Sequence, residues 1–507
     1  MNKIVKYIVA LSMLFSAFSC SDFLDINTDV SVPQKVQASA IFTPVLAQIP
    51  RGEAFDVRYI SRYIQNVTLN TSGGDIYERH GYAVAPSDLM GDIWRQHYYA
   101  IGTNIDLIIE DASSKQQWDM VGAAKAIRAW SWQTTTDYHG EIILDQAWEP
   151  NRYVFEFDSQ EKVYAHVVKI CNEALADLDK GGVPNLKAGD NVYNGDVAKW
   201  RKFIYSILAR NANHLSNKSI YKPDDVIKYC DLSLATNADN FGIPHNGSNT
   251  SDANFYGPLR ANLLDYRPTT TIMKLVDGTT FGGVRDPRLP IMFAPSRDTV
   301  YRGLQTFTTD PNNAANAPKR ILNLFGLEPG IAAPAGFTGR WIYADKAPHY
   351  VVTAAEIQFI KAEAAFRKGD KAMALAAFRK GVETHMQFCS VTTANITAFL
   401  ASAAVPQAAA DLKMSDIMQQ KYIALYMLGA IETWVDMRRF KYDPTIYTTY
   451  VMPVGTQYYP DNNGKLAYRV RPHEVRWKED GDFFSEGLQI IWMRVREELL
   501  YYWMKRL

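Results

Sequence analysis

One segment of the sequence brings three ionisable side chains close together at the end of a predicted helix. This segment is Asp137-Tyr138-His139-Gly140-Glu141. Two carboxylates flanking an imidazole could act as a general acid and a general base. The alternative is a structural turn after a core helix, in which Gly140 supplies a positive φ that other residues adopt with difficulty. We favour the turn, so the segment alone does not predict catalysis.

Motifs for catalysis, cofactors and metals are otherwise missing from the sequence. It contains no Walker A sequence, no GxGxxG, no GxSxG and no HExxH. None of its nine histidines has a His or Cys partner at the spacing of a metal site. Residues 461–464 (DNNG) resemble the beginning of a calcium loop without its full ligand series, and they predict a turn, although a structural calcium stays open. We therefore predict a protein that is not an enzyme, with no catalytic residue, metal ligand or cofactor.

Aromatic residues stand beside hydrogen-bonding groups in predicted loops. A sugar ring has one apolar C–H face and a rim of hydroxyls, so it suits a flat aromatic side chain surrounded by Arg, Asn, Asp or Gln. For each residue, the alternative of an aromatic that packs in the core or anchors a loop stays open. The tryptophans within predicted helices are expected in the core: Trp94, Trp130, Trp132, Trp200 and Trp434. The predicted ligand-binding residues are Tyr77, Arg79, His80, Tyr82, Tyr256, Arg260, Trp341, Tyr343 and Trp477.

The composition is that of a globular protein, with 47% hydrophobic and 21% charged residues among 507. Lys+Arg and Asp+Glu both number 54, which argues against a nucleic-acid partner bound by phosphate neutralisation. Four cysteines are too few for a disulfide scaffold. Cys171 and Cys230 lie in predicted helices, and we expect them to be buried thiols.

The N-terminus is typical of an exported protein. Two lysines precede an uncharged apolar run over residues 7–18, which is too short to span a bilayer. The run leads to Ala17-Phe18-Ser19-Cys20, which resembles a bacterial lipobox although Ala17 and Phe18 replace the usual Leu and small residue. We predict a signal peptide over residues 1–19, a tether over residues 20–38 and acylation of Cys20, which would anchor the protein in membrane lipid. Plain secretion with an incidental thiol is the alternative.

Helical patterns dominate residues 39–507, which we expect to form a single large, mostly α domain. Two tracts, about 236–348 and 442–482, are rich in Gly, Pro and Asn and only weakly periodic. Loops of this length inside a compact domain are usually functional, so these insertions are expected to form a ligand face. The predicted helices cover residues 39–46, 58–69, 88–109, 118–134, 159–178, 196–217, 223–235, 354–368, 371–386, 395–400, 415–440 and 488–507.

Residues 362–382 have the pattern of a tetratricopeptide helix pair. Ala362, Ala374 and Phe378 occupy its small, small and aromatic positions, and Gly369-Asp370 occupies the turn. Small side chains let two antiparallel helices approach closely, with Phe378 between them. One unit is equally compatible with any αα-hairpin that turns at glycine, and the other helix pairs do not repeat the pattern at a fixed period. We therefore predict packed, tetratricopeptide-like pairs instead of a regular solenoid.

Seven segments resemble, in order, those of SusD/RagB-family outer-membrane nutrient-binding lipoproteins of Bacteroidetes. The similarity extends from Cys20 to about Asp480, and Ile143 and Leu144 depart from it where proline is common. Residues 493–507 also depart from it and look like an added amphipathic helix. The seven segments are residues 19–29, 123–147, 157–178, 193–212, 285–290, 356–370 and 419–440.

The resemblance implies both a fold and a function. The fold is one of tetratricopeptide-like helix pairs that support a ligand face built from loops. The function is to bind a glycan at the cell surface, on an outer-membrane lipid anchor, and to deliver it to a SusC-like TonB-dependent transporter without chemistry. Binding residues vary within the family, so only Cys20 is carried over by its motif. A surface glycoside hydrolase and a helical scaffold without a ligand remain alternatives, and the glycan is unidentified; a peptide ligand is not excluded.

Overall fold

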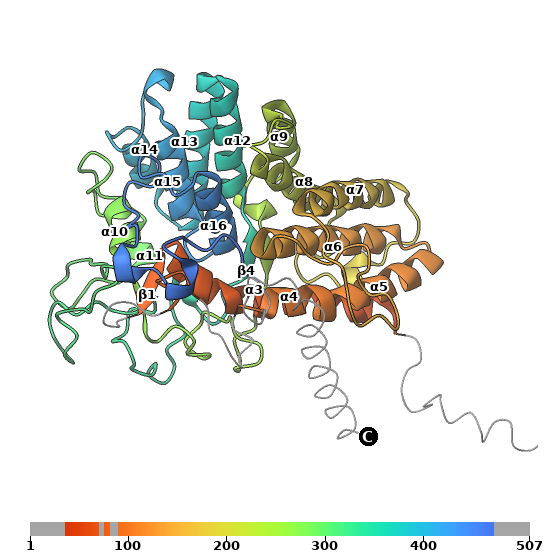
Figure 1. Cartoon of the computed structure of the whole chain (residues 1–507), viewed down its shortest axis with the longest axis horizontal. Helices are drawn as coiled ribbons and strands as arrows, with labels where there is room; N and C mark the ends of the chain where they lie inside the picture. The colour runs from red at the N-terminus through yellow and green to blue at the C-terminus, as the bar shows by residue number, and fades with distance from the viewer. Residues whose placement is uncertain (1–35, 70–75, 82–89, 471–507) are drawn as a thin grey trace, which may run out of the picture.

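Helices make up most of the structure, a computed structural model that describes residues 36–69, 76–81 and 90–470 (Figure 1). Cys20, Tyr82, Trp477, the signal peptide and the C-terminal helix predicted over residues 488–507 lie outside these residues. The helices are α3 (Ala38–Tyr63), α4 (Asp92–Arg95), α5 (Thr103–Ser114), α6 (Trp118–His139), α7 (Gln160–Asp179), α8 (Val197–His214), α9 (Pro223–Leu232), α10 (Thr270–Val276), α11 (Leu289–Met292), α12 (Ala354–Lys368), α13 (Lys371–Phe388), α14 (Thr393–Leu400), α15 (Met414–Ala424) and α16 (Ala430–Arg439).

Strands and single helical turns connect these helices. Strand β1 (Val67–Leu69) pairs antiparallel with β3 (Tyr266–Pro268), and β2 (Phe241–Ile243) pairs antiparallel with β4 (His349–Val352). Strands β3 and β2 lie in the insertion over residues 236–348, so the two ribbons tie it to the segment after α3 and to the segment before α12. The shorter elements are the π-helix η1 (Gln96–Gly102) and the 3₁₀ turns η2 (Leu186–Ala188), η3 (Asn237–Asp239), η4 (Trp341–Tyr343), η5 (Ala409–Asp411), η6 (Gly455–Gln457) and η7 (Pro460–Asn462).

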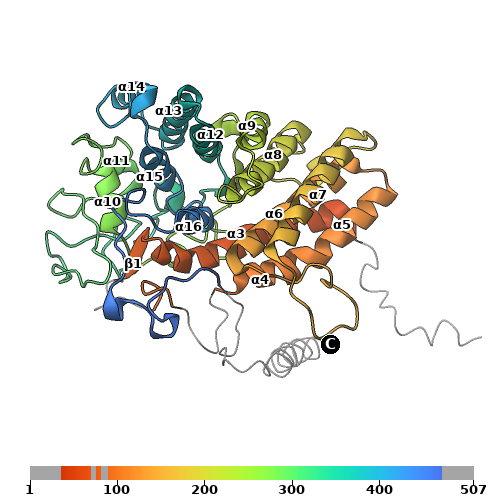
Figure 2. The same cartoon turned by 45° about the horizontal axis from the view of Figure 1, so that its top comes forward.

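Pairs of neighbouring helices pack side by side, as α6 does with α7 and α12 with α13 (Figure 2). The α12–α13 pair confirms the predicted hairpin, because Gly369 ends α12 with a φ of 89° and Asp370 caps α13 by accepting from the backbone N–H of Met373. Ala362, Ala374 and Phe378 are fully buried between the helices and their neighbours. The predicted mostly α fold of tetratricopeptide-like pairs is therefore confirmed.

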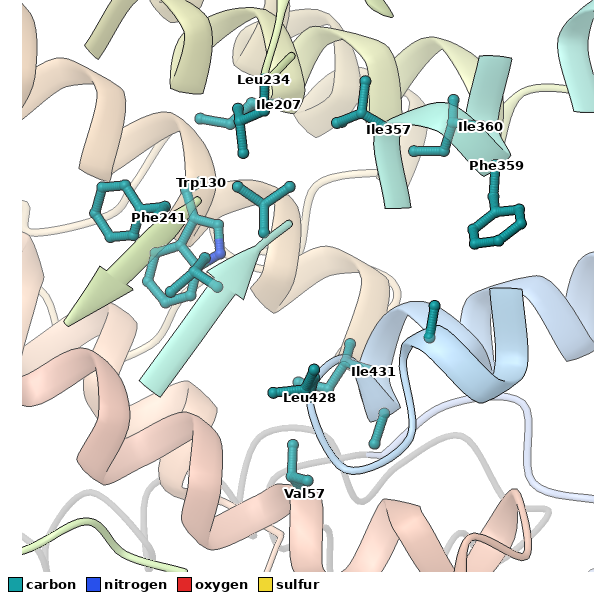
Figure 3. Packing of buried hydrophobic residues seen from close by; sticks show 14 of the residues in the cluster. Val57, Trp130, Ile207, Leu234, Phe241, Ile357, Phe359, Ile360, Leu428 and Ile431 are labelled. Carbon is teal, nitrogen blue, oxygen red and sulfur yellow. The ribbon is translucent and has the colours of Figure 1, made fainter. Parts of the chain in front are cut away.

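The hydrophobic core joins segments that are far apart in the sequence. Figure 3 shows Val57 of α3, Trp130 of α6, Ile207 of α8 and Ile357 of α12 converging around the β2–β4 ribbon. Four of the five helical tryptophans are buried as predicted, whereas Trp94 is half-buried. Cys171, Cys230 and Cys389 are free, buried thiols, in agreement with the prediction for the first two. In the described part of the chain, no helix combines the length and the apolar character that crossing a membrane requires.

The helix boundaries predicted around α3, α15 and α16 are wrong. The sequence predicts separate helices over residues 39–46 and 58–69, but α3 runs without a break from Ala38 to Tyr63 and contains Pro44 and Pro50, and residues 67–69 form β1. Each proline removes one backbone hydrogen bond, yet the buried face of α3 holds the helix in place, and the side-chain amide of Gln96 donates to the carbonyls of Gln48 and Ile49. Conversely, residues 415–440 form two helices, α15 and α16, with a break between them.

That break is held by a distant residue. Met427 adopts a φ of 58°, and its N–H donates to the side-chain oxygen of Asn66, just before β1, at 3.1 Å. The insertion over residues 236–348 contains only short elements joined by long loops, which gather beside β1, α10 and α11 (Figure 1). The tract from residue 442 to residue 470 contains only η6 and η7, and Asn463 with a φ of 49° makes residues 461–464 the predicted turn.

Candidate functional site

The predicted turn after α6 is confirmed. Gly140 follows the last helical residue, His139, and has a φ of 83°. Asp137, Tyr138 and His139 are all buried, and Nδ1 of His139 is hydrogen-bonded to the carbonyl of Val470. The side chains of Asp137, Tyr138 and His139 therefore point into the protein, whereas Glu141 is exposed and pairs with Arg469.

Asp137 belongs to a buried cluster with His214 and Glu432, which come from α6, α8 and α16. One ligand-type atom from each residue lies within 4.8 Å of the others, a separation that could hold a metal ion. These atoms already bond one another, because His214 lies 3.3 Å from Asp137 and 2.9 Å from Glu432, and Tyr164 donates to Asp137. Burial lowers the pKa of His214, but the two carboxylates outweigh it and raise that pKa to about 9. The cluster works as a network of ion pairs between helices.

Four of the predicted ligand-binding side chains are buried: Tyr77, His80, Tyr256 and Tyr343 are at most 4% exposed. Tyr77 packs against Tyr59 with ring centroids 4.5 Å apart, and His80 stacks on Tyr63 at 4.6 Å. Tyr256 lines an internal cavity of about 10 Å³. Such a space holds about one water molecule and not a sugar ring. These four side chains thus support the structure around a site.

Arg79, Arg260 and Trp341 are partly exposed. Arg79 donates from Nη2 to the carbonyls of Thr456 and Tyr458, so it fastens the tract after α16 to the segment after β1. Trp341 begins η4 and meets the ring of Tyr343 edge-on, with centroids 5.7 Å apart. Arg260 lies elsewhere, over a different group of aromatic rings. The structure therefore does not bring the predicted residues together in one place.

The rings near Arg260 belong to a stripe along α3. Its members are spaced at i, i+4, i+7, i+8 and i+11, which places them on one face of a helix. At the buried end of the stripe, the side chain of Arg62 is 2% exposed and pairs with Glu78, with Nε 2.8 Å from Oε1. At the other end, Arg51 is exposed. The stripe consists of Arg51, Phe55, Arg58, Tyr59 and Arg62.

A loop of the insertion covers the stripe with Phe255 and Arg260. The guanidinium of Arg58 lies 4.4 Å from the ring centroid of Phe55 and 4.9 Å from that of Phe255, and Arg260 lies 5.2 Å from Phe255. Cation–π contacts of this length fix the plane of each guanidinium. We name Arg51, Phe55, Arg58, Phe255 and Arg260 the arginine–aromatic surface.

Hydrogen bonds to Asp345 and its neighbours hold this loop in position. Asn254 donates its side-chain amide to the carbonyls of Ile342 and Ala344, and the N–H of Leu259 donates to Oδ1 of Asp345 at 3.0 Å. The backbone of Gly257 passes so close that an added Cβ would lie 2.3 Å from Oδ1 of Asp345. A rigid helix and a firmly held loop therefore form the two sides of the surface.

Like charges converge on the arginine–aromatic surface. Burial and the charges of Arg51 and Arg58 together lower the pKa of Arg260. The neighbouring carboxyl group is that of Asp92, at the start of α4. Burial raises its pKa to about 6, although Arg51 and Arg58 act in the opposite direction. Arg260 is among the residues predicted from the sequence, whereas Phe55 and Arg58 are not. Their signal is the helical spacing of Arg and aromatic residues along α3.

An open cleft lies elsewhere on the insertion. Its volume is about 440 Å³, and Arg285 lies at its edge with the guanidinium 4.9 Å from the ring centroid of Tyr301. Residues 285–290 belong to one of the segments that resemble the family, but none of them is among the predicted ligand-binding residues. The other residues that line the cleft are Asp286, Pro287, Pro290, Thr299 and Asn395. The cleft is large enough for a small ligand, and it is a second candidate site.

Known proteins of the same fold are numerous. A SusD/RagB family protein from Bacteroides thetaiotaomicron is 20% identical, with 90% of this chain and 96% of that one covered and a TM-score of 0.63. A SusD homolog from Bacteroides fragilis is 17% identical over 86% of this chain and 92% of its own, with a TM-score of 0.63. A chitin-binding SusD homolog from Flavobacterium johnsoniae is 18% identical over 80% and 86%, with a TM-score of 0.61. No curated protein sequence matches the chain.

The sequence itself also matches a family. Residues 30–469 match the SusD-like family described as "starch-binding associating with outer membrane". The match covers most of the chain, including every described helix, and it agrees with the fold of the three solved structures. The resemblance found in seven separate segments is thereby confirmed along the whole helical domain: the protein belongs to the SusD/RagB family.

Proposed function

We propose that this protein captures a glycan at the cell surface and delivers it to a SusC-like TonB-dependent transporter of the outer membrane. The observation that carries the proposal is the arginine–aromatic surface, where the half-buried ring of Phe55 and the guanidinium groups of Arg58 and Arg260 are held on α3 and on a braced loop, beside the buried ring of Phe255. Flat rings beside hydrogen-bond donors suit the C–H face and the hydroxyls of a sugar. The family description and the chitin-binding relative support a carbohydrate ligand.

The residues predicted from the sequence have different parts in this proposal. Arg260 binds the ligand directly, whereas Arg79 and Trp341 lie apart from the arginine–aromatic surface. Tyr82 and Trp477 lie outside the described residues. Tyr77, His80, Tyr256 and Tyr343 support the site from within. Acylated Cys20 anchors the chain in the outer-membrane lipid. The protein performs no chemistry, and its affinity is micromolar to millimolar, because delivery requires rapid release.

Affinity electrophoresis on a panel of glycans that includes starch and chitin oligosaccharides tests the capture step. We expect retention of the wild-type protein by at least one glycan and a clear loss of retention in Arg260→Ala. Tyr301→Ala, which alters the separate cleft, is the matched control and should retain the glycan. Retention that depends on Tyr301 and not on Arg260 would move the site to the cleft. Release of reducing ends by the purified protein would instead favour the hydrolase.

A gentle detergent pull-down of the tagged, full-length protein from its own outer membrane tests the delivery step. Mass spectrometry should find a large β-barrel transporter in near-equal amount. The Cys20→Ser variant, which cannot be acylated, should leave the membrane fraction. If intact, lipidated protein brings down no transporter, the delivery step is wrong and a free-standing surface binder remains.

A further inference from the structure

The arginine–aromatic surface differs in its charge balance from three buried arginine sites of the protein. Arg210 pairs with Glu356, Arg288 with Asp286 and Arg439 with Glu363, all in buried positions. Arg51, Arg58 and Arg260, by contrast, form no ion pair with any carboxylate of the described residues. Because the whole chain has equal numbers of acidic and basic residues, this local excess of positive charge is not a consequence of the overall composition.

The nearby carboxylates are occupied or poorly placed to balance this charge. Glu78 pairs with Arg62, and Glu53 lies 3.0 Å from Nε2 of His349. Asp56 is fully buried and accepts from the N–H of Ile93 at 3.0 Å. Asp92 pairs with Arg95 at 3.4 Å. Three cations that repel one another, with only Asp92 as a neighbouring carboxyl group, destabilise the site unless a ligand supplies further negative charge.

The three guanidinium groups also keep donors available. Arg58 donates from Nε to the carbonyl of Phe55 at 3.3 Å and from Nη2 to the hydroxyl of Tyr59 at 3.4 Å, and both bonds are long. Within the described residues, the side chains of Arg51 and Arg260 donate no hydrogen bond. The rings of Phe55 and Phe255 fix the guanidinium planes, and a fixed fork of N–H groups matches a carboxylate or a sulfate with two parallel bonds.

We propose that the arginine–aromatic surface recognises an anionic glycan through the carboxylate or sulfate groups on its sugar rings. This inference rests on the proposed glycan capture and names the class of glycan. Arg58 and Arg260, whose guanidinium groups lie 4.9 and 5.2 Å from the ring centroid of Phe255, together bind the charged group. Arg51 adds charge at the exposed end and attracts the ligand from solvent.

Matched glycan pairs that differ only in charge test the inference on the intact protein. The probes are polygalacturonate with its methyl-esterified form, and a sulfated galactan with its desulfated form. Isothermal calorimetry and affinity electrophoresis should show at least about tenfold tighter binding of the charged member of a pair, the gain expected for one charge-assisted hydrogen-bond pair. The difference in affinity should shrink as the salt concentration rises from about 50 to about 500 mM, because this rise shortens the electrostatic screening length roughly threefold.

Single arginine variants locate the site. Arg58→Gln and Arg260→Gln should each lower the affinity for the charged glycan about tenfold and leave that for its neutral counterpart unchanged. Arg260 lies on a loop, so Arg260→Gln remains informative if Arg58→Gln fails to fold, and circular dichroism reports folding for both. The matched control is Arg285→Gln, because Arg285 is also an exposed arginine over an aromatic ring but lines the separate cleft. It should bind like the wild type.

Each contrary result has a distinct meaning. Equal binding of charged and neutral members overturns the inference and leaves glycan capture standing. Retention of no glycan at all overturns both. An effect of Arg285→Gln in place of Arg58→Gln and Arg260→Gln overturns the assignment to this surface. Unchanged glycan binding by these two variants, with loss of the co-purified transporter, overturns the inference in favour of a protein contact.

Discussion

Nε2 of His214 lies 2.9 Å from Oε2 of Glu432, and this contact joins α8 to α16 inside the protein. The other ring nitrogen, Nδ1, lies 3.3 Å from Oδ2 of Asp137 at the end of α6. One imidazolium therefore bridges carboxylates from two helices, and Arg210 of α8 lies 3.7 Å from the same Glu432. Asp137, one of the residues that resemble an acid–base site in the sequence, thus helps to fix the arrangement of helices beneath the loops.

The raised pKa of His214 predicts a loss of stability at alkaline pH. An unfolded histidine has a pKa near 6.5, whereas that of folded His214 is about 9. Its contribution is fully present below pH 6.5 and is lost as the pH rises from 6.5 through 9, because the unfolded chain releases the proton first. Urea unfolding should show a loss of up to about 3 kcal/mol across this range.

The variant His214→Gln isolates this contribution. It should be less stable than the wild type at pH 6, and its free energy of unfolding should change little between pH 6.5 and 9. His166→Gln is the control, because His166 is half-buried and burial lowers its pKa. That variant should keep the wild-type slope. A wild-type protein with no slope in this range would show that His214 is neutral in the folded state.

The buried ion pair between Arg210 and Glu356 predicts a large loss of folding stability when one partner is removed. Nε and Nη2 of Arg210 lie 2.6 and 2.7 Å from the two carboxylate oxygens of Glu356, and both side chains are buried. Arg210→Met should lower the free energy of unfolding by about 3–5 kcal/mol, because it leaves a buried carboxylate unpaired. The double variant Arg210→Met/Glu356→Met should recover much of this loss.

A partly exposed pair provides the comparison for that experiment. Arg302 and Asp298 are paired with side chains 25% and 27% exposed. Arg302→Met should cost less than about 1 kcal/mol, because water solvates both charges when the pair is broken. Equal losses for Arg210→Met and Arg302→Met in urea unfolding would contradict the role assigned to the buried pair.

Substitutions in the core of the α12–α13 hairpin should lower the folding stability more than substitutions in its turn. Phe378 is fully buried and faces Phe359 with ring centroids 6.3 Å apart. Phe378→Ala should lower the free energy of unfolding by about 3–5 kcal/mol through lost burial and the cavity left behind. Gly369→Ala should lower the free energy of unfolding by only about 1–2 kcal/mol. The new Cβ meets open space, so the loss comes only from the backbone strain of an alanine at a φ of 89°. Chemical denaturation measures the loss of stability in both variants. A larger loss for Gly369→Ala than for Phe378→Ala would contradict this prediction.

The close passage of Gly257 beside Asp345 predicts an effect on binding that exceeds the effect on stability. In Gly257→Ala, the new methyl group displaces Asp345, so the N–H of Leu259 loses its acceptor and Arg260 shifts from its place over Phe255. Glycan retention in affinity electrophoresis should fall sharply. Gly336→Ala, in the same insertion, is the control: with a φ of 79° and open space around it, it should lower stability and keep retention.

Local signals in the sequence were sufficient for the hairpin and for most helices. Ser159 caps α7 by accepting from the N–H of Lys162, and Gly369 ends α12, as their residue types indicate. The same local rules failed at α3, which they divide into separate helices over residues 39–46 and 58–69. There the burial of Phe42, Leu46 and Ile49 in the core outweighs the lost backbone hydrogen bonds.

The sequence by itself determined the helical class, the paired packing of α12 with α13 and the family, because caps, periodicity and ordered segments are properties of neighbouring residues. Only the tertiary structure decided which candidates meet. Arg58 and Arg260 are far apart in the sequence and share the ring of Phe255, whereas Tyr77, His80, Tyr256 and Tyr343 are buried. Whether an aromatic residue in a loop faces solvent or the core depends on which distant segments pack against it. The neighbouring residues in the sequence do not indicate which segments these are.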